Sequence, residues 1–400
     1  MSNYPVDTKQ WLAKLVSFNT ISSNPNMELV QYIEAYLKPL GFCCVRIPSP
    51  TRPDTHANLW ATLPGKDGSM SGGIILSGHL DVVPVKDQVW KSDPFVLTER
   101  NGKLYGRGSS DMKGFIAVAL HLAPYFAKLK SRKRAVHYSF SFDEEVGCAG
   151  VPFLIDHLKK NNITADACLV GDADFEVITG SKGIASWRVT VHGKAIHSSM
   201  ALMNTSCNAV EHASRIVWKI RELALELREH GPRDKHYVNP FCAMSVGLIN
   251  GGNAPNTVPS SCDFVFSVRY TDTNISREVE RKVRAFIDEV VLPEMKKEAP
   301  QAKVEMKPEW FAPAFNADEN HAFTKLVRKM VSNNKVRKQA GATESGFFQD
   351  ILKIPTVNIG PGGFGAHCPN EFTEEKLLLK AEKFTAELVE IITTNGVPKL

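Results

Sequence analysis

Hydrophobic residues recur with two different periods along the first 180 residues. The segments with helical spacing are residues 7–18, 27–41, 112–123 and 151–160. Between them lie short apolar runs at residues 72–78, 135–142 and 167–171. Pro39 and Gly41 end the second helical segment, since proline cannot continue a helix and glycine commonly follows one. Short apolar strands separated by helices are typical of a largely parallel α/β sheet covered by helices.

The pattern changes after about residue 180. Strand-like alternation is found at residues 183–193, 242–251 and 262–270, with a weaker strand at 302–307. Helical spacing occupies residues 205–230 and 276–291. The order strand, helix, strand, strand, helix, strand predicts a two-layer α+β sandwich of the ferredoxin-like type.

The first pattern returns from Phe311 onward. A helix is predicted at residues 318–333, a buried strand at 354–360 and an amphipathic helix at 374–394. We therefore expect one α/β domain formed by residues 1–180 and 311–400. Residues 181–310 are then a second domain, inserted into the first.

Composition is that of an ordinary globular protein, with 43% hydrophobic and 23% charged residues and a net charge of +5. The one dense basic run, residues 128–134, lacks interleaved aromatic residues, so we expect no nucleic-acid partner. No apolar segment reaches a membrane-spanning length, and the first residues lack the apolar core of a signal peptide. The eight cysteines form no CxxC pair, which favours reduced thiols in a cytoplasmic protein.

Acids and histidines follow the predicted strands of the α/β domain. In such sheets, ligands bind at the carboxyl ends of the strands and near helix N-termini. Imidazole and carboxylate ligands suit Zn²⁺, Co²⁺ or Mn²⁺, and a bridging carboxylate allows two ions to share a site. Asp81 could hold the imidazole of His79 in place. The candidate ligands are His79, Asp111, Glu145, Asp172 and His367.

Each of these motifs has a simpler interpretation by itself. Asp111 could cap the helix that follows it, and the acids at 143–145 could form a solvated turn. The segment GPGGFG (360–365) resembles a dinucleotide-binding loop, but it leads to His367 rather than into a helix, so we expect no nicotinamide cofactor. A non-catalytic binding protein is a further alternative. The shared position of the motifs favours a metal site.

Six ordered motifs make the chain similar to a known family. They are SGHLDVVP (77–84), GRGSSDMKG (106–114), FDEEVGCAG (142–150), HGKAIHSSM (192–200), NGGNAPNTVP (250–259) and AHCPNEF (366–372). In this order they resemble the dinuclear-zinc amidohydrolases and peptidases, a family that includes acetylornithine deacetylases, succinyl-diaminopimelate desuccinylases, aminoacylases and carboxypeptidases. The sequence looks most similar to the acetylornithine deacetylases. The resemblance covers residues 10 to 390.

The resemblance implies two zinc ions per chain, which Co²⁺ or Mn²⁺ could replace. It also implies a catalytic domain with an inserted dimerisation domain, a homodimer, and a cis peptide bond after Asp111. Glu144 is then the general base, and His197 reaches across the dimer to stabilise the oxyanion. Arg269 and Asn256 bind a substrate carboxylate. The implied ligands are His79 and Asp172 for one zinc, Glu145 and His367 for the other, and Asp111 for both.

The implied reaction is the hydrolysis of a small N-acyl amino acid, N-acetylornithine to ornithine and acetate, as in arginine biosynthesis. A desuccinylase, aminoacylase, carboxypeptidase or dipeptidase is the alternative. The chain departs from the family pattern at Asp172, where glutamate is usual and Asp174 is a nearby competitor, and at Asn370, where aspartate is usual. We hypothesise that Glu344, in GATESGFF (341–348), faces the cationic side chain of the substrate, since a buried ammonium needs a partner. Asp143 has no assigned role.

Overall fold

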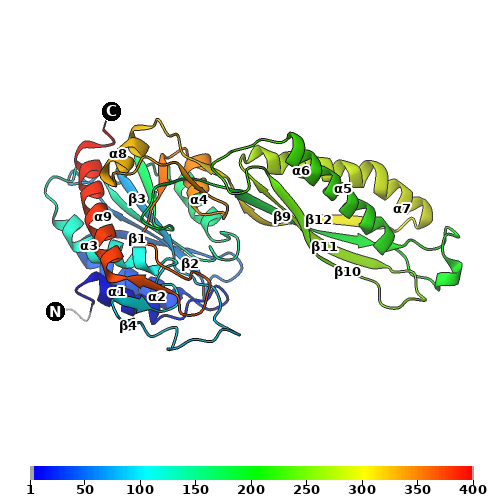
Figure 1. Ribbon diagram of the computed structural model, residues 1–400, viewed down its shortest axis with the longest axis horizontal. Helices are drawn as coiled ribbons and strands as arrows, with labels where there is room; N and C mark the ends of the chain where they lie inside the picture. Colours follow the sequence, from blue (N-terminus) through cyan, green and yellow to red (C-terminus); the bar gives the residue numbers. More distant parts are fainter. Residues whose placement is uncertain (1–3, 399–400) are drawn as a thin grey trace. The chain divides into compact units, whose positions relative to one another are not determined.

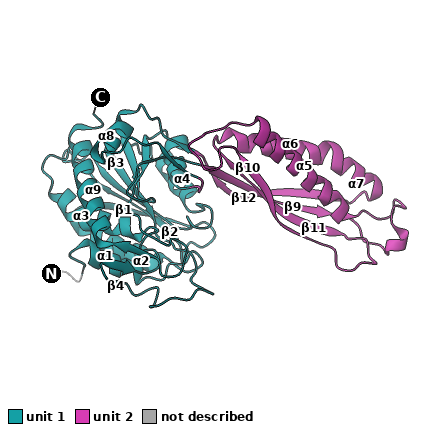
Figure 2. Cartoon of the chain, in the orientation of Figure 1, with its two compact units in different colours: residues 1–181, 315–339, 343–400 teal, residues 182–314, 340–342 magenta. Residues whose placement is uncertain are grey.

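A computed structural model describes residues 4–398 of the chain. The chain divides into two compact units, which Figure 2 distinguishes by colour. Unit 1 takes the chain up to Ser181 together with Phe315–Gln339 and the chain from Thr343 onward. Unit 2 takes Lys182–Ala314 and the short piece Ala340–Ala342. The sequence pattern gives no sign that residues 340–342 belong with unit 2.

The main sheet of unit 1 has parallel strands at its centre (Figure 1). Its strands are β1 (Cys43–Pro48), β2 (Ala57–Leu63), β3 (Ile74–His79), β6 (Val136–Ser141), β7 (Ala167–Val170), β8 (Ile178–Ser181), β13 (Phe315–Asn316), β14 (Arg337–Gln339) and β15 (Thr356–Asn358). The order is β1-β2-β6-β3-β7-β15-β8-β13, with β14 on β8. Strands β6, β3, β7 and β15 run parallel, whereas β1, β2 and β13 pair antiparallel. The mixed, helix-covered α/β sheet confirms the predicted fold class.

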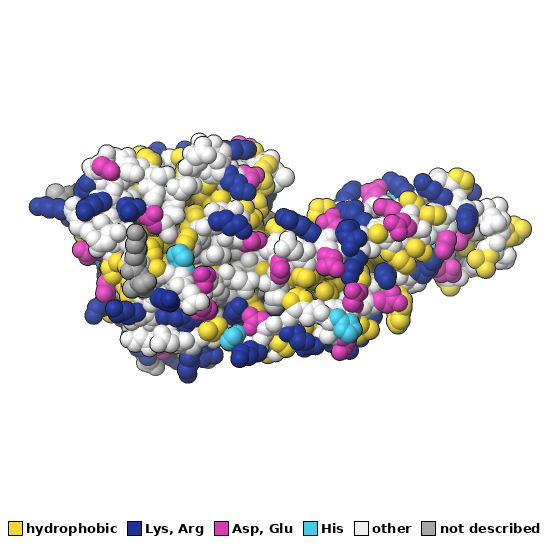
Figure 3. All heavy atoms as spheres, turned by 90° about the horizontal axis from the view of Figure 1, so that it is seen from above, with side chains coloured by type: hydrophobic (Ala, Val, Ile, Leu, Met, Phe, Trp, Pro, Cys, Tyr) yellow, Lys and Arg dark blue, Asp and Glu magenta, His cyan; other side chains and the backbone are white. Residues whose placement is uncertain are grey.

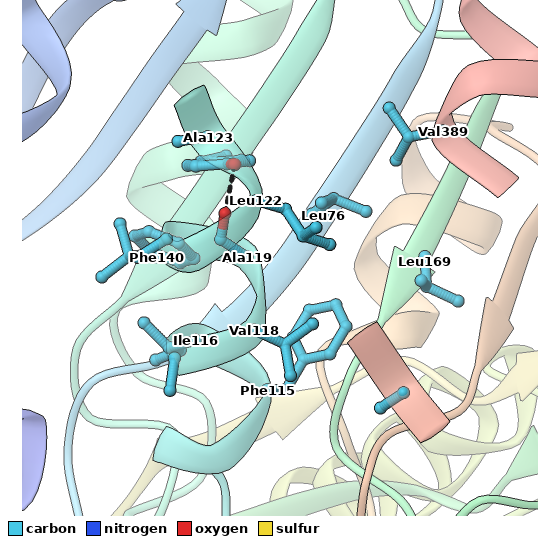
Figure 4. Close-up of a cluster of buried hydrophobic side chains, with 14 of the residues drawn as sticks. Leu76, Phe115, Ile116, Val118, Ala119, Leu122, Ala123, Phe140, Leu169 and Val389 are labelled. Atoms are coloured by element: carbon cyan, nitrogen blue, oxygen red, sulfur yellow. Dashed lines mark hydrogen bonds between the residues drawn. The ribbon is translucent and has the colours of Figure 1, made fainter. Parts of the chain in front are cut away.

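Helices of unit 1 bury their apolar sides against this sheet and one another. They are α1 (Thr8–Val16), α2 (Met27–Leu37), α3 (Lys113–Lys128), α4 (Val151–Lys160), α8 (Ala322–Met330) and α9 (Glu375–Asn395). Helix α3 contacts α1, α9 and β3, and it is buried on nearly every side. Figure 4 shows its Phe115, Val118 and Leu122 in one cluster with Leu76 of β3 and Leu169 of β7. Burial of each large apolar side chain contributes about 1.5–3 kcal/mol.

Some elements of unit 1 leave no clear pattern in the sequence. Strand β1 is mostly exposed and β2 is buried on both faces, so neither shows the alternation that marks a half-buried strand. A small antiparallel sheet, β4 (Thr98–Arg100), β5 (Lys103–Tyr105) and β16 (Phe372–Glu374), joins segments far apart in the chain. Strands this short depend on their partners rather than on local propensity.

Unit 2 is a two-layer sandwich. Its elements are β9 (Gly183–His192), α5 (Ala209–His230), β10 (Ala243–Gly251), β11 (Ser261–Tyr270), α6 (Asn274–Phe286), η3 (Ile287–Val291), α7 (Leu292–Glu298) and β12 (Lys303–Ala312). The four strands are antiparallel in the order β10-β11-β9-β12. This βαββαβ order confirms the predicted ferredoxin-like sandwich. Phe264, Phe266 and Val268 of β11 point into its core, and the residues between them face the other way.

Helix α5 begins four residues later than the sequence pattern predicts, and the reason is local. The Asn208 side chain accepts hydrogen bonds from the N–H groups of Val210 and Glu211 and so caps the helix. Just before it, the backbone of Cys207 pairs with that of Lys194 in both directions, at 2.9 and 3.0 Å. Cys207 is therefore held in a β-bridge, and residues 205–208 are not the first turn of a helix.

The surface of the protein carries both signs of charge. Figure 3 shows Lys and Arg side chains mixed with Asp and Glu across the face that it displays. Among residues 4–398, no helix combines the length and the apolar character needed to cross a membrane.

Candidate metal centre

Four neighbouring parallel strands of unit 1 bring the predicted ligands to one edge of the sheet. His79 is the last residue of β3, Glu145 follows β6, Asp172 follows β7, and a loop after β15 leads to His367. Because β6, β3, β7 and β15 run parallel and adjacent, their carboxyl ends lie together. Residues remote in the chain are therefore close in space.

Gly171, between the end of β7 and Asp172, cannot be replaced by a residue with a side chain. A Cβ atom on Gly171 would lie 1.9 Å from the ring of Phe115, so no other residue fits without a large shift. The bare backbone lets the end of β7 approach α3 closely. Since Asp111 directly precedes the Met112 cap of α3, this close approach brings Asp172 near Asp111.

Asp111 lies between the two histidines. Its Oδ1 is 3.1 Å from Nε2 of His79, and its Oδ2 is 3.2 Å from Nε2 of His367. The His367 Nε2 is also 2.9 Å from Oε2 of Glu145. The peptide bond between Asp111 and Met112 is cis, as the resemblance implied, and Asp111 does not cap α3.

The ligand atoms form two groups that share Asp111. Those of His79, Asp111 and Asp172 lie within 4.8 Å of one another, as do those of Asp111, Glu145 and His367. We call these five residues the donor cluster. Asp174 is not among them, since its Oδ1 faces the N–H of Gly363 at 3.4 Å. The geometry thus places Asp172 rather than its competitor in the cluster.

Asp81 connects His79 to the acidic segment 143–145. Its carbonyl oxygen is 3.0 Å from Nδ1 of His79, and its carboxylate lies 3.6 Å from the same nitrogen. The carboxylate also accepts the N–H groups of Glu144 at 3.0 Å and Glu145 at 3.2 Å, and the hydroxyl of Ser22 at 2.7 Å. One buried residue therefore orients an imidazole through its carbonyl group and, through its carboxylate, the turn that carries both glutamates.

The three consecutive acids 143–145 face different partners. Asp143 forms an ion pair with Arg52, a contact that the sequence did not reveal. Glu145 reaches His367, whereas Glu144 Oε2 lies 4.0 Å from Nε2 of His79. The Glu144 carboxylate is nearly buried and belongs to neither group of ligand atoms. It is close enough to the donor cluster to exchange a proton with a molecule bound there.

Electrostatics favour a cation at this place. Burial, with nearby Asp111, raises the pKa of Asp172 to about 8, and burial also raises the pKa of Glu144 well above its usual range. Hydrogen bonds to Asp111 and Glu145 raise the pKa of His367 to about 10. Oε1 of Glu145 is buried without a hydrogen-bond partner among the described residues. Close carboxylates with unused lone pairs, together with imidazoles, fit one or more divalent cations.

Sequence reasoning missed two residues that support Asp111. The buried carboxylate of Glu371 accepts the N–H groups of Gly108, Ser110 and Asp111 at 3.0, 2.8 and 3.0 Å. It also pairs with Arg107 at 2.6 Å. The available signal was that both charged residues lie inside motifs that resemble the family.

Glu344 lies in unit 1, near enough to Asp172 to affect its pKa. Its Oε2 accepts the hydroxyl of Ser77 on β3 at 3.0 Å, and its Oε1 accepts that of Ser141 on β6. The side chain is buried, and burial raises the pKa of Glu344. The two serines give this carboxylate polar partners inside the unit.

The remaining predicted site residues belong to unit 2. His197 is exposed, with Nδ1 2.9 Å from the Ser199 hydroxyl, and its segment pairs with Thr257. The carbonyl of Asn256 accepts the N–H of Ser198 at 2.9 Å, so His197 and Asn256 lie in neighbouring segments. Arg269 is on the face of β11 opposite to the core.

Comparison with known proteins identifies the family. The model of "Peptidase family M20/M25/M40" matches residues 75–391, which is most of the chain. The chain belongs to this family. It is therefore an enzyme of the M20 hydrolases, a metal-dependent family of peptidases and deacetylases.

Two curated relatives are similar over nearly their whole length. The acetylornithine deacetylase of Photorhabdus laumondii is 28% identical over 91% of this chain and 90% of its own. The acetylornithine deacetylase of Shigella sonnei is 28% identical over 91% of this chain and 89% of its own.

Solved structures share the fold at lower identity. An M20 family metallo-carboxypeptidase from Sulfolobus solfataricus has a TM-score of 0.73 at 18% identity, covering 98% of this chain and 100% of its own. The YXEP protein of Bacillus subtilis, described as a dinuclear metal-binding peptidase of the M20 family, has a TM-score of 0.65 at 15% identity, covering 96% of this chain and 98% of its own.

Proposed function

We propose that this enzyme hydrolyses the amide bond of an N-acyl amino acid at the donor cluster. The observation that carries the proposal is the position of Asp111, whose two oxygens each face one histidine. A carboxylate so placed can hold two divalent cations side by side. His79 and Asp172 would complete one site, and Glu145 and His367 the other. The ions are two Zn²⁺ in our proposal, with Co²⁺ or Mn²⁺ as substitutes.

Bound cations would supply a more acidic water and a polarised carbonyl group. Glu144 would take the proton from the attacking water and deliver it to the departing amine. The raised pKa of this buried side chain suits a group that must hold the proton between the two steps. Asp81 keeps the imidazole of His79 in one orientation through its Nδ1 contact.

Three residues of unit 2 would act on the substrate. His197 would donate a hydrogen bond to the oxyanion, reaching from the second subunit of a homodimer. Arg269 would pair with the substrate carboxylate, for which a planar guanidinium is suited, and Asn256 would assist it. These three roles rest on the motif resemblance.

A homodimer is supported by the surface of unit 2. Strand β10 is one of the two edge strands of its sheet, and Leu248 and Ile249 on it are exposed. Trp218 of α5, 65% exposed, lines a groove of about 380 Å³ together with Met244 and Val246 of β10. An open apolar edge strand is unfavourable in water unless another chain covers it.

N-acetylornithine is the substrate we propose, because both of the relatives compared above are named acetylornithine deacetylases. Another N-acyl amino acid or a peptide is the alternative, since the solved structures with this fold include a carboxypeptidase and a dipeptidase. Glu344 separates these possibilities in our hypothesis. Its negative charge lies close to the donor cluster, where it would attract the side-chain ammonium of ornithine.

The test combines metal analysis with a substrate panel. We expect purified protein loaded with Zn²⁺ to hydrolyse N-acetylornithine faster than N-acetyl derivatives of neutral amino acids. Glu144→Gln should lose at least about 100-fold in kcat while it keeps its metal. Glu344→Gln should impair hydrolysis of N-acetylornithine much more than that of a neutral analogue. Fewer than one metal ion per chain and no hydrolysis of any panel member would refute the proposal, and equal losses in Glu344→Gln would remove the specificity hypothesis.

A further inference from the structure

A second group of potential metal ligands lies in unit 2, in a part of the chain to which the proposed reaction assigns no role. The Cys207 sulfur, a nitrogen of His212 and a carboxylate oxygen of Glu298 all lie within 4.8 Å of one another. Cys207 is 1% exposed and His212 is 6% exposed. Three different ligand types, two of them buried, therefore converge on one point.

Each of the three residues is held by a well-defined element. Cys207 is fixed by its backbone pairing with Lys194, and His212 is in the first turns of α5, whose cap is Asn208. Glu298 is the last residue of α7. The convergence is therefore a property of the packed unit and not of a loose loop.

The contacts between these side chains leave polar capacity unused. Nε2 of His212 is 3.1 Å from Oε2 of Glu298, but its Nδ1 is buried and has no hydrogen-bond partner in the described chain. A buried imidazole nitrogen without a partner is unfavourable. Because Nε2 faces Glu298, Nε2 is the nitrogen that could bind a cation together with Glu298, and the bare Nδ1 is not itself evidence of a metal.

The charges around Glu298 favour a cation beside it. Glu298 ends a helix, where the helix dipole disfavours a carboxylate and favours a cation. Arg215 forms an ion pair with Glu294 and also interacts with Glu298 over a longer distance, so it offsets that charge only in part. With a thiolate and a carboxylate as ligands, a divalent cation would make the group neutral.

We propose that Cys207, His212 and Glu298 bind a borderline-soft divalent cation, of which Zn²⁺ is the best match. A tetrahedral zinc site, with bonds of about 2.0–2.3 Å, separates its ligand atoms by about 3.3–3.8 Å. The 3.1 Å between Nε2 of His212 and Oε2 of Glu298 is near that spacing, and the sulfur of Cys207 lies within 4.8 Å of the ligand atoms of both residues. Three protein ligands leave a fourth position for water.

A catalytic thiol is the main alternative, and the environment argues against it. Burial and the adjacent Glu298 raise the pKa of Cys207 to about 12. A nucleophilic cysteine needs a lowered pKa and access for its substrate, and Cys207 has neither. Binding of a cation would instead displace the thiol proton to solvent, so affinity should increase with pH.

Cobalt distinguishes this site from the donor cluster, because only this site has a thiolate ligand. We expect Co²⁺-loaded wild-type protein to show thiolate-to-cobalt charge-transfer absorption in the near ultraviolet, and to hold one equivalent more than Cys207→Ser. Cys207→Ser should lose the absorption. Cys368→Ser should keep it, which controls for the exposed cysteine next to His367.

A second variant, Glu298→Gln, keeps the test decisive if Cys207→Ser folds poorly. Glu298→Gln alters a partly exposed ligand and should weaken Co²⁺ binding at this site at least about tenfold while far-ultraviolet circular dichroism stays unchanged. Absence of the absorption in wild-type protein, or its survival in Cys207→Ser, would overturn the proposal. The inference does not rest on the proposed function, since hydrolysis depends on the donor cluster and the absorption depends on Cys207.

Discussion

Glu371 offers the sharpest test of how unit 1 holds Asp111. Each carboxylate oxygen accepts two hydrogen bonds. Oε1 accepts the N–H groups of Ser110 and Asp111, and Oε2 accepts the N–H of Gly108 and the guanidinium of Arg107. Glu371→Gln preserves the shape but turns one oxygen into an N–H₂ group that faces two donors. Removal of one partner of a buried ion pair lowers the free energy of unfolding by about 3–5 kcal/mol.

The lower end of that range applies here. Burial raises the pKa of Glu371 even though three N–H groups and Arg107 counteract it, so desolvation is not completely offset. We therefore expect a loss of about 3 kcal/mol, which corresponds to a urea midpoint lower by about 1 M or less, because the denaturant dependence m is large for a chain of this size. Displacement of Asp111 should also lower kcat/KM by about 10- to 100-fold.

The matched control is Glu374→Gln. Glu374 is three residues away, and its ion-pair partner Lys376 is exposed. Loss of such a surface pair should change stability by less than about 1 kcal/mol. Urea unfolding and steady-state hydrolysis of all three proteins provide the comparison. Equal midpoints and equal kcat/KM for Glu371→Gln and Glu374→Gln would refute the reasoning.

Three other predictions follow from the described contacts. Burial lowers the pKa of His137 from 6.5 to about 4, so the unfolded chain binds the proton more tightly. The neutral imidazole therefore contributes about 3 kcal/mol to the free energy of unfolding above pH 6.5, and this contribution should be lost as pH falls toward 4. The urea midpoint of His137→Gln should depend less on pH than that of the wild type over the same range. Asp172→Asn should reduce metal content, whereas Asp174→Asn should not, and equal content in both would show that Asp172 is not a ligand. Trp218→Glu should convert a dimer into a monomer in light scattering, and an unchanged mass would place the interface elsewhere.

The pattern of hydrophobic residues predicted those helices and strands that have one buried and one exposed side. The ferredoxin-like unit was predicted because β9 and β11 alternate between core and surface and α5 has an apolar side. Strand β2 was missed because all of its residues are buried, which removes the alternation. The start of α5 was misplaced because Asn208, a cap with no hydrophobic signal, decides it.

The ligand types and their motifs were available from the sequence. His79, Asp111 and Glu145 stood out because each follows a strand or precedes a helix. Glu371 and Arg107 did not, because neither a carboxylate that accepts backbone N–H groups nor its buried ion-pair partner leaves a spacing pattern. The same holds for Cys207, His212 and Glu298, whose proximity depends on the packing of α5 against α7.

The sequence by itself determined the fold class, the order of the elements in the ferredoxin-like sandwich and the chemical types of the candidate ligands. It could do so because hydrophobic periodicity and residue chemistry are local properties. Only the tertiary structure decided that Asp172 rather than Asp174 joins the donor cluster, that Asp143 pairs with Arg52, and that Glu344 meets two serines. Those contacts depend on which strands are neighbours and on close approach at Gly171, and neither is encoded in any short segment.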